Sequence, residues 1–299
     1  MNLELQALSA SHPAARPGAT PAIRGLSLRI AAGEQVAIIG PSGAGKTTLL
    51  QVLACALPPA AGTLQLGEQA PWKMPRRALQ QLRGQLFLAP QVPPLPPRQR
   101  TVTAVLAARL PRMGLLASVR SLFYPADIAA AHAALDRFDL ADKLFERVDR
   151  LSGGERQRVG LARALLAMQP MPGDAVDRAA GNGVGKKAGG ARLLLIDEPL
   201  SALDPTRSRQ AIAALIDGAR EHGATLIATL HQVDVAMAMF GRIIGLRDGH
   251  LAFDLPVSEV TGDHLARLYD QFEHELRGEA PQPEACAPPV PPPAVMHCR

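Results

Sequence analysis

Residues 40–48 read Gly-Pro-Ser-Gly-Ala-Gly-Lys-Thr-Thr, and they connect the apolar run 36–39 to the apolar pair 49–50. A glycine loop between a buried strand and a helix is typical of a phosphate-binding loop, because its backbone amides and the positive end of the helix dipole converge on one anion. We expect the Lys46 ammonium to reach the β- and γ-phosphates and the Thr47 hydroxyl to bind Mg²⁺. The predicted nucleotide-binding residues are Gly40, Pro41, Ser42, Gly43, Ala44, Gly45, Lys46, Thr47 and Thr48.

The composition sets broad limits. The 299 residues are 47% hydrophobic, which is enough for one large α/β domain or two smaller ones. A net charge of +5 fits phosphate ligands or an anionic membrane surface without requiring nucleic acid. The three cysteines have no paired spacing, which favours a reducing cytoplasm. No apolar stretch approaches the ~18–20 residues of a membrane-spanning helix, so the chain is not itself expected to form a channel.

The periodicity of apolar residues suggests three parts. Residues 2–8 and 23–30 alternate like strands around a turn-rich insert at 11–21, and an outer strand is expected near Leu64 and Leu66. A helix follows the glycine loop to about residue 56. Residues 98–150 have helical periodicity, with Ile128, Ala131 and Leu135 on one face together with Phe138. We therefore predict a helical subdomain at about 92–168, inserted into an α/β core.

Two segments are predicted to lie outside the core. Residues 171–191 are rich in glycine and poor in large apolar side chains, so they are expected to form a flexible insertion. Residues 278–299 are rich in proline and are expected to form a disordered tail. The predicted folded domain therefore covers residues 1–277.

A second conspicuous stretch, residues 193–198, reads Leu-Leu-Leu-Ile-Asp-Glu. Ligands bind at the carboxyl ends of strands in parallel sheets, so Asp197 is expected to hold Mg²⁺ directly or through water. Glu198 is placed to polarise a water for attack on the γ-phosphate. An acidic pair after a strand also occurs in ordinary surface turns, but its combination with the phosphate loop favours the catalytic interpretation.

Residues 151–155, Leu-Ser-Gly-Gly-Glu, open a predicted helix. Ser152 and Glu155 have the spacing of a capping box, and Gly153 and Gly154 leave amide groups uncovered at the positive end of the helix dipole. The alternative is an ordinary capped helix. With one phosphate loop and a second anion site in the same chain, two copies could each contribute half of a nucleotide site.

These motifs, with Ser-Ala-Leu-Asp at 201–204 and Leu-His-Gln at 230–232, resemble the nucleotide-binding subunit of ATP-binding cassette (ABC) transporters from about Leu3 to Asp270. The resemblance implies a P-loop ABC cassette with a RecA-like core, an antiparallel β N-terminal portion and an inserted helical subdomain. It also implies a head-to-tail homodimer that binds ATP and Mg²⁺. In such a dimer Ser152 and Gly154, with Gly153, contact the γ-phosphate held by Lys46 of the other copy. Asp204 lies at the seam, and His231 contacts the γ-phosphate beside Glu198.

Three positions depart from the family pattern. Gln91 matches the glutamine that senses Mg²⁺, but it lies in the proline-rich segment 90–97, which stiffens a link that moves in the family. His12 occupies the place of the aromatic residue expected to stack on adenine, and it is equally consistent with an ordinary loop residue. The insertion at 171–191 is the third departure, and it affects no predicted catalytic residue.

Finer matches, among them Thr229–Asp234 and Ser121–Phe123, resemble the phosphonate-import ATPases. That resemblance implies ATP hydrolysis powering uptake of phosphonate or a related phosphorus oxyanion. The implied partners are transmembrane permease subunits and, indirectly, a periplasmic substrate-binding protein, with the chain peripheral on the cytoplasmic face of the inner membrane. No nucleic-acid partner is expected.

Other functions stay open. Within transport, the alternatives are an importer of phosphate, phosphite or another solute, and an exporter. A soluble ABC ATPase acting on nucleic acid or ribosomes usually has two cassettes or long coiled coils, and this chain has one cassette and no heptad run. A purely regulatory module would be expected to lack Glu198, Lys46 or His231, and all three are present.

Overall fold

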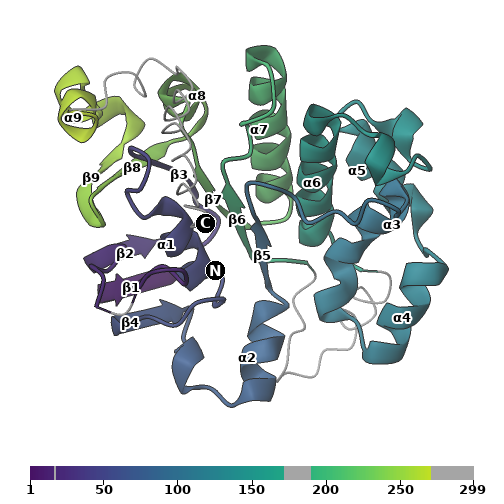
Figure 1. Ribbon diagram of the computed structural model, residues 1–299, viewed down its shortest axis with the longest axis horizontal. Coiled ribbons are helices and arrows are strands. Elements are labelled where there is room, and N and C mark those ends of the chain that lie inside the picture. The colour runs from purple at the N-terminus through teal and green to yellow at the C-terminus, as the bar shows by residue number, and fades with distance from the viewer. Residues whose placement is uncertain (17, 172–189, 271–299) are drawn as a thin grey trace, which may run out of the picture.

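A six-stranded sheet runs through the middle of the computed structural model, which describes residues 1–16, 18–171 and 190–270 (Figure 1). Its strands lie in the order β5-β6-β7-β3-β8-β9. They are β3 (Gln35–Ile39), β5 (Leu86–Ala89), β6 (Leu193–Asp197), β7 (Thr225–Thr229), β8 (Arg242–Arg247) and β9 (His250–Pro256). Neighbouring strands are parallel except for the antiparallel pair β8 and β9.

Both faces of the sheet are buried at its inner strands β3, β6 and β7, which explains their apolar sequences. Along β3, Ala37 and Ile39 belong to one hydrophobic core, whereas Val36 and Ile38 belong to another. Successive side chains of a strand point to opposite faces, so every position of a strand between two cores faces an apolar environment. The α/β class expected from the glycine loop and its flanking strand is confirmed.

A smaller antiparallel sheet forms the N-terminal portion, with the order β2-β1-β4. It consists of β1 (Leu3–Ala10), β2 (Ile23–Ile30) and β4 (Ala61–Leu66), as the alternating pattern predicts. Its apolar face shares a core with α1 (Lys46–Leu53) and with the central sheet. The helix after the glycine loop ends at Leu53, earlier than expected, because Cys55 takes a left-handed backbone with φ of 55°.

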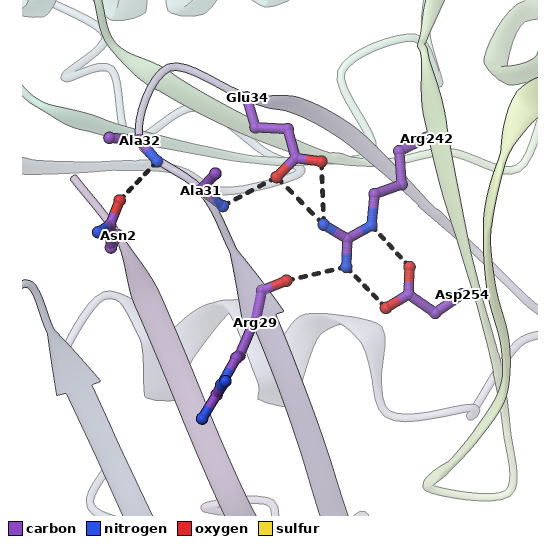
Figure 2. A network of polar contacts seen from close by, with 7 residues as sticks. All are labelled: Asn2, Arg29, Ala31, Ala32, Glu34, Arg242 and Asp254. Atoms are coloured by element: carbon purple, nitrogen blue, oxygen red, sulfur yellow. Dashed lines mark hydrogen bonds and ion pairs between the residues drawn. The ribbon is translucent and has the colours of Figure 1, made fainter.

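One arginine ties the two sheets together (Figure 2). At the start of β8, the Arg242 guanidinium donates to Asp254 on β9 at 2.7 Å and to Glu34, just before β3, at 2.9 Å. It also donates to the backbone carbonyl of Arg29 on β2 at 2.8 Å. The planar guanidinium thus joins three chain segments at the end of the sheet opposite the glycine loop.

Helices cover the other face of the central sheet (Figure 1). Helices α6 (Gly153–Met168), α7 (Pro205–Glu221) and α8 (Val233–Met239) share the core on that face with α3 (Thr101–Leu106) and α5 (Ile128–Asp136). Helix α4 (Leu115–Phe123) packs beside α3, α2 (Arg76–Arg83) lies next to β5, and α9 (Gly262–Leu268) lies next to β8. On α5, Ala131 and Leu135 are buried as expected, but Ile128 is 39% exposed because it is the first residue of its helix. None of the helices in the described ranges combines the length and apolar character needed to cross a bilayer.

Residues 172–189 and 271–299 lie outside the described residues, and so do almost all of the predicted insertion and the whole predicted tail. The insertion's last residue is described and does not fit a flexible segment: Ala191 is buried, and its N–H donates to the Ala167 carbonyl at 2.7 Å. The domain limits 1–277 and about 92–168 stay predictions.

Candidate functional site

Four neighbouring parallel strands carry the predicted catalytic segments at their carboxyl ends. Gln91 follows β5, Asp197 ends β6 with Glu198 directly after it, His231 follows β7, and the glycine loop follows β3. Because the carboxyl ends of parallel strands meet at one edge of a sheet, segments far apart in the chain come together there.

The glycine loop has a backbone that requires glycine at two positions. Gly40 has φ of 151°, and a Cβ there would lie 2.1 Å from the Leu246 carbonyl oxygen. Gly45 has φ of 97°, and a Cβ there would lie 2.4 Å from the Ala22 carbonyl oxygen. Such close packing lets the loop turn directly into α1, whose first amides have no partner within the helix.

Lys46, the first residue of α1, is buried with its side chain folded into the loop. Its ammonium donates to the carbonyl oxygens of Gly40 at 2.6 Å and Pro41 at 3.1 Å. A buried ammonium needs such acceptors, and phosphate oxygens can take their place. The loop is therefore shaped to receive an anion beside Lys46.

The Glu198 carboxylate is the point where three of the strand ends meet. Its Oε2 accepts a hydrogen bond from Gln91 Nε2 at 2.7 Å, and its Oε1 lies 2.5 Å from His231 Nε2. The Glu198 backbone has φ of 47°, in the left-handed region that residues with side chains rarely adopt. Such strain persists where the surroundings enforce it, and it is frequent in functional sites.

Opposing effects act on the pKa of Glu198. Burial of the carboxylate raises its pKa, but the hydrogen bond from His231 and the charges of His231 and Lys46 lower it, and the pKa falls below the ordinary 4.5. The carboxylate is therefore ionised at neutral pH, which is the form that can accept a proton.

Thr229, the last residue of β7, is a site residue that sequence reasoning missed. Its hydroxyl donates to Asp197 Oδ1 at 2.7 Å and accepts the Glu198 backbone N–H at 2.9 Å. The residue is fully buried, between the strand that carries the carboxylates and the strand that leads to the glycine loop. In the sequence, the feature that could have identified Thr229 as a site residue is its position as a polar residue directly after the apolar run 226–228.

The predicted second anion site lies at the start of α6. Ser152 Oγ accepts the Glu155 N–H at 3.2 Å, and the Glu155 carboxylate accepts the Ser152 N–H at 2.7 Å, so the expected capping box is present. Hydrogen bonds from the Ser152 backbone and side chain lower the pKa of Glu155. Gly153 has open space around it, whereas a Cβ on Gly154 would lie 3.0 Å from the Ala202 carbonyl oxygen.

Asp204 lies close to that helix start and caps α7. Its Oδ1 accepts the Arg207 N–H at 3.0 Å, and this bond is the largest cause that lowers the pKa of Asp204. Burial lowers the pKa of the nearby Arg158 guanidinium, and the negative charges of Glu155 and Asp204 oppose this shift. The structure therefore groups Ser152, Gly154 and Asp204 at the starts of two helices.

His12, the candidate for adenine stacking, is exposed in the segment after β1. Its Nδ1 accepts the Ala14 N–H at 3.1 Å, a local hydrogen bond typical of a turn. Its role toward a nucleotide stays a prediction.

Two further buried groups support the site. Gln157 on α6 donates from Nε2 to the Pro199 carbonyl at 3.1 Å, which fixes the turn after Glu198. The Tyr269 hydroxyl accepts the Gly40 N–H at 3.2 Å. Neither was predicted, because both contacts join segments far apart in the sequence.

The chain is similar in sequence to known proteins. The ABC transporter family model matches residues 23–171. A curated phosphonates import ATP-binding protein of Polaromonas sp. is 61% identical over 299 residues, which is 100% of both chains. One from Pseudomonas aeruginosa is 46% identical over 92% of this chain and 92% of its own. The chain belongs to the ATP-binding subunits of ABC transporters.

The structural comparison agrees with this assignment. A dimeric bacterial ABC transporter cassette superposes with a TM-score of 0.66 at 23% identity, covering 85% of this chain and 98% of that chain, which supports the fold alone. A bacterial ABC exporter with ATP bound has a TM-score of 0.66 at 25% identity, over 93% of this chain and 42% of that chain. The predicted cassette fold is confirmed. As a member of this family, the chain binds and hydrolyses ATP.

Proposed function

We propose that this chain hydrolyses ATP with the groups gathered at the ends of β3, β5, β6 and β7, and that it powers the uptake of phosphonate or a related phosphorus oxyanion. The observation that carries the catalytic part is the position of Glu198, an ionised carboxylate with His231 and Gln91 on either side. The names of close relatives support the transported substrate.

In the proposed reaction, Lys46 moves its ammonium from the Gly40 and Pro41 carbonyls to the β- and γ-phosphates. Glu198 accepts a proton from the attacking water while the water oxygen bonds to the γ-phosphorus and the bond to the bridging oxygen breaks. His231 holds the carboxylate of Glu198, and its proposed second role is to contact the γ-phosphate. Thr229 fixes both the carboxylate of Asp197 and the backbone of Glu198.

The donor set at the strand ends fits Mg²⁺. Thr47, Asp197 and Gln91 offer hydroxyl, carboxylate and amide oxygens, the atoms that a hard cation prefers. Among the described residues no group of three or more His, Cys, Asp or Glu is assembled, and Mg²⁺ sites commonly combine one or two carboxylates with substrate phosphates. When bound, the cation neutralises charge that develops on the phosphates.

A homodimer completes the proposed site. The starts of α6 and α7 carry Ser152, Gly153 and Asp204 as exposed residues, with the half-buried Gly154 beside them. Uncovered amides at a helix start bind anions, so this group is suited to the γ-phosphate held by Lys46 of a second copy. We further propose that permease subunits hold the dimer on the cytoplasmic face of the inner membrane, and that a periplasmic substrate-binding protein delivers the cargo.

The catalytic proposal is tested with Glu198→Gln. The amide cannot accept a proton, so we expect ATP to bind with near-normal affinity while turnover falls by about 1,000-fold. Glu221→Gln makes the same chemical change at an exposed position at the end of α7 and should leave turnover unchanged. Near-normal phosphate release by Glu198→Gln would remove Glu198 from the role of base.

The transport proposal needs a separate test, because none of these residues contacts the cargo. A strain that lacks the gene should fail to grow on a phosphonate as sole phosphorus source but should grow on inorganic phosphate. The wild-type chain should restore growth, and Lys46→Ala should not. Normal phosphonate uptake by the deletion strain would contradict the substrate and leave the ATPase assignment intact.

A further inference from the structure

A buried tyrosine directly after α9, the last helix among residues 1–16, 18–171 and 190–270, contacts the glycine loop. Tyr269 directly follows α9 and is 1% exposed. Its hydroxyl accepts the N–H of Gly40, the first residue of the glycine loop, at 3.2 Å. The carbonyl of the same Gly40 accepts the Lys46 ammonium at 2.6 Å. A chain of two hydrogen bonds therefore connects the end of α9 to the phosphate-binding lysine.

The helix that carries Tyr269 is attached to the strand beside the loop. Arg247, at the end of β8, donates to the Arg267 carbonyl and lies 3.8 Å from the Asp270 carboxylate. The preceding residue, Leu246, has the carbonyl that blocks any side chain on Gly40. Figure 1 shows α9 beside β8 and β9. The end of β8 thus holds α9 on one side and the loop on the other.

We propose that Tyr269 is a positioning residue of the phosphate loop, whose buried hydroxyl holds the Gly40 amide and so links the docking of α9 to the affinity for ATP. The inference rests on the proposed ATP site. Gly40 has no side chain to limit its rotation, and a buried N–H without an acceptor turns toward another partner. The tyrosine hydroxyl prevents this by supplying the acceptor in the conformation that forms the cradle.

The expected consequence falls on binding more than on folding. Without the hydroxyl, the nucleotide-free loop relaxes, and ATP must restore its conformation on binding. Docking of α9 and binding of ATP are thermodynamically linked. If docking of α9 raises the affinity for ATP by a given factor, ATP raises the equilibrium constant for docking of α9 by the same factor. Nucleotide should therefore slow amide exchange in residues 262–269, which lie outside the nucleotide contacts proposed above.

The test is Tyr269→Phe, with Tyr124→Phe as its matched control. Tyr124 is the other tyrosine of the chain and is 76% exposed, so the same oxygen is removed where it faces water. Calorimetric titration with a non-hydrolysable ATP analogue should give a dissociation constant about fivefold higher for Tyr269→Phe and unchanged for Tyr124→Phe. Arg247→Met removes the side-chain contacts with Arg267 and Asp270 and leaves the Tyr269 hydroxyl in place, and it should shift the constant in the same direction.

Amide hydrogen exchange distinguishes the proposed link from a purely structural role of Tyr269, because only the link makes the protection of α9 depend on nucleotide. The analogue should protect residues 262–269 in the wild type and protect them less in Tyr269→Phe. An unchanged dissociation constant for Tyr269→Phe would overturn the inference, and so would equal shifts in the two tyrosine variants. Failure of the wild type itself to bind the analogue would overturn the proposed function, and this inference with it.

Discussion

At the scale of single residues, Thr229 organises two carboxylate residues through one hydroxyl. It donates to Asp197 Oδ1 at 2.7 Å and accepts the N–H of Glu198, whose backbone is in the left-handed region. Thr229→Val keeps the shape and removes both bonds. We expect ATP turnover to fall by about 10–100-fold and the Mg²⁺ concentration for half-maximal activity to rise, because Asp197 is a proposed Mg²⁺ ligand and residues that orient metal ligands have effects of this size.

Two variants separate this role from folding. Thr229→Ser restores the hydroxyl and should recover most of the turnover. Thr225→Val makes the same change at the other end of β7, where the buried hydroxyl accepts the Gly33 N–H at 3.0 Å. It should lower the melting temperature and leave turnover per folded molecule unchanged. Equal loss of turnover in Thr225→Val and Thr229→Val would contradict the positioning role.

At the scale of elements, the structure shows why a long insertion after α6 can be tolerated. The Ala191 N–H donates to the Ala167 carbonyl at 2.7 Å, so the chain returns beside the end of α6 before it enters β6. Replacing residues 172–189 with a linker of about six Gly and Ser residues should leave the melting temperature and turnover near wild type, because shortening a loop changes its closure entropy little. Thermal unfolding and phosphate release measure both.

A substitution at Ala191, just beyond the replaced segment, serves as the control for this replacement. Ala191→Asp places a charge in a buried position at the end of the same connection, just before β6, and should destabilise the protein strongly. If the linker variant is insoluble or inactive, residues 172–189 contribute structure that the glycine-rich composition did not predict.

At the scale of the whole molecule, Arg242 joins the two sheets. Its guanidinium contacts Asp254, Glu34 and the carbonyl of Arg29, and its side chain is 23% exposed (Figure 2). Arg242→Met keeps most of the stem but leaves two half-buried carboxylates without their partner. The free energy of unfolding should fall by about 1–3 kcal/mol, measured by urea denaturation.

A surface pair provides the comparison. Arg29→Met removes a guanidinium that lies 2.7 Å from Glu4 but is 79% exposed, so it should change the free energy of unfolding by less than about 1 kcal/mol. The affinity for ATP should be unchanged in Arg242→Met, because the network lies at the end of the sheet opposite the glycine loop. Similar losses of stability in the two variants would show that Arg242 contributes no more than a surface ion pair.

The sequence by itself determined the features that are local along the chain. The glycine loop is specified by a contiguous strand, turn and helix, and the caps at Ser152 and Asp204 join residues three positions apart. Hydrogen bonds at such short separations depend on the backbone conformation of one segment. For the same reason the strands at 23–30 and 193–197 and the helix that opens at 151–155 were predicted from spacing and periodicity, and so was the first strand, predicted at 2–8 and observed at Leu3–Ala10.

Only the tertiary structure decided which of these segments meet. The contacts of Glu198 with Gln91 and His231 depend on the strand order β5-β6-β7-β3, which no local pattern encodes. The hydrogen bond from Gly40 to Tyr269 spans 229 positions, and it exists because β8 holds α9 against the loop. The secondary-structure preference of a segment is the same whether or not one of its hydroxyl or amide groups has a distant partner. Hydrogen bonds between distant segments therefore follow from the packing of the sheets and helices.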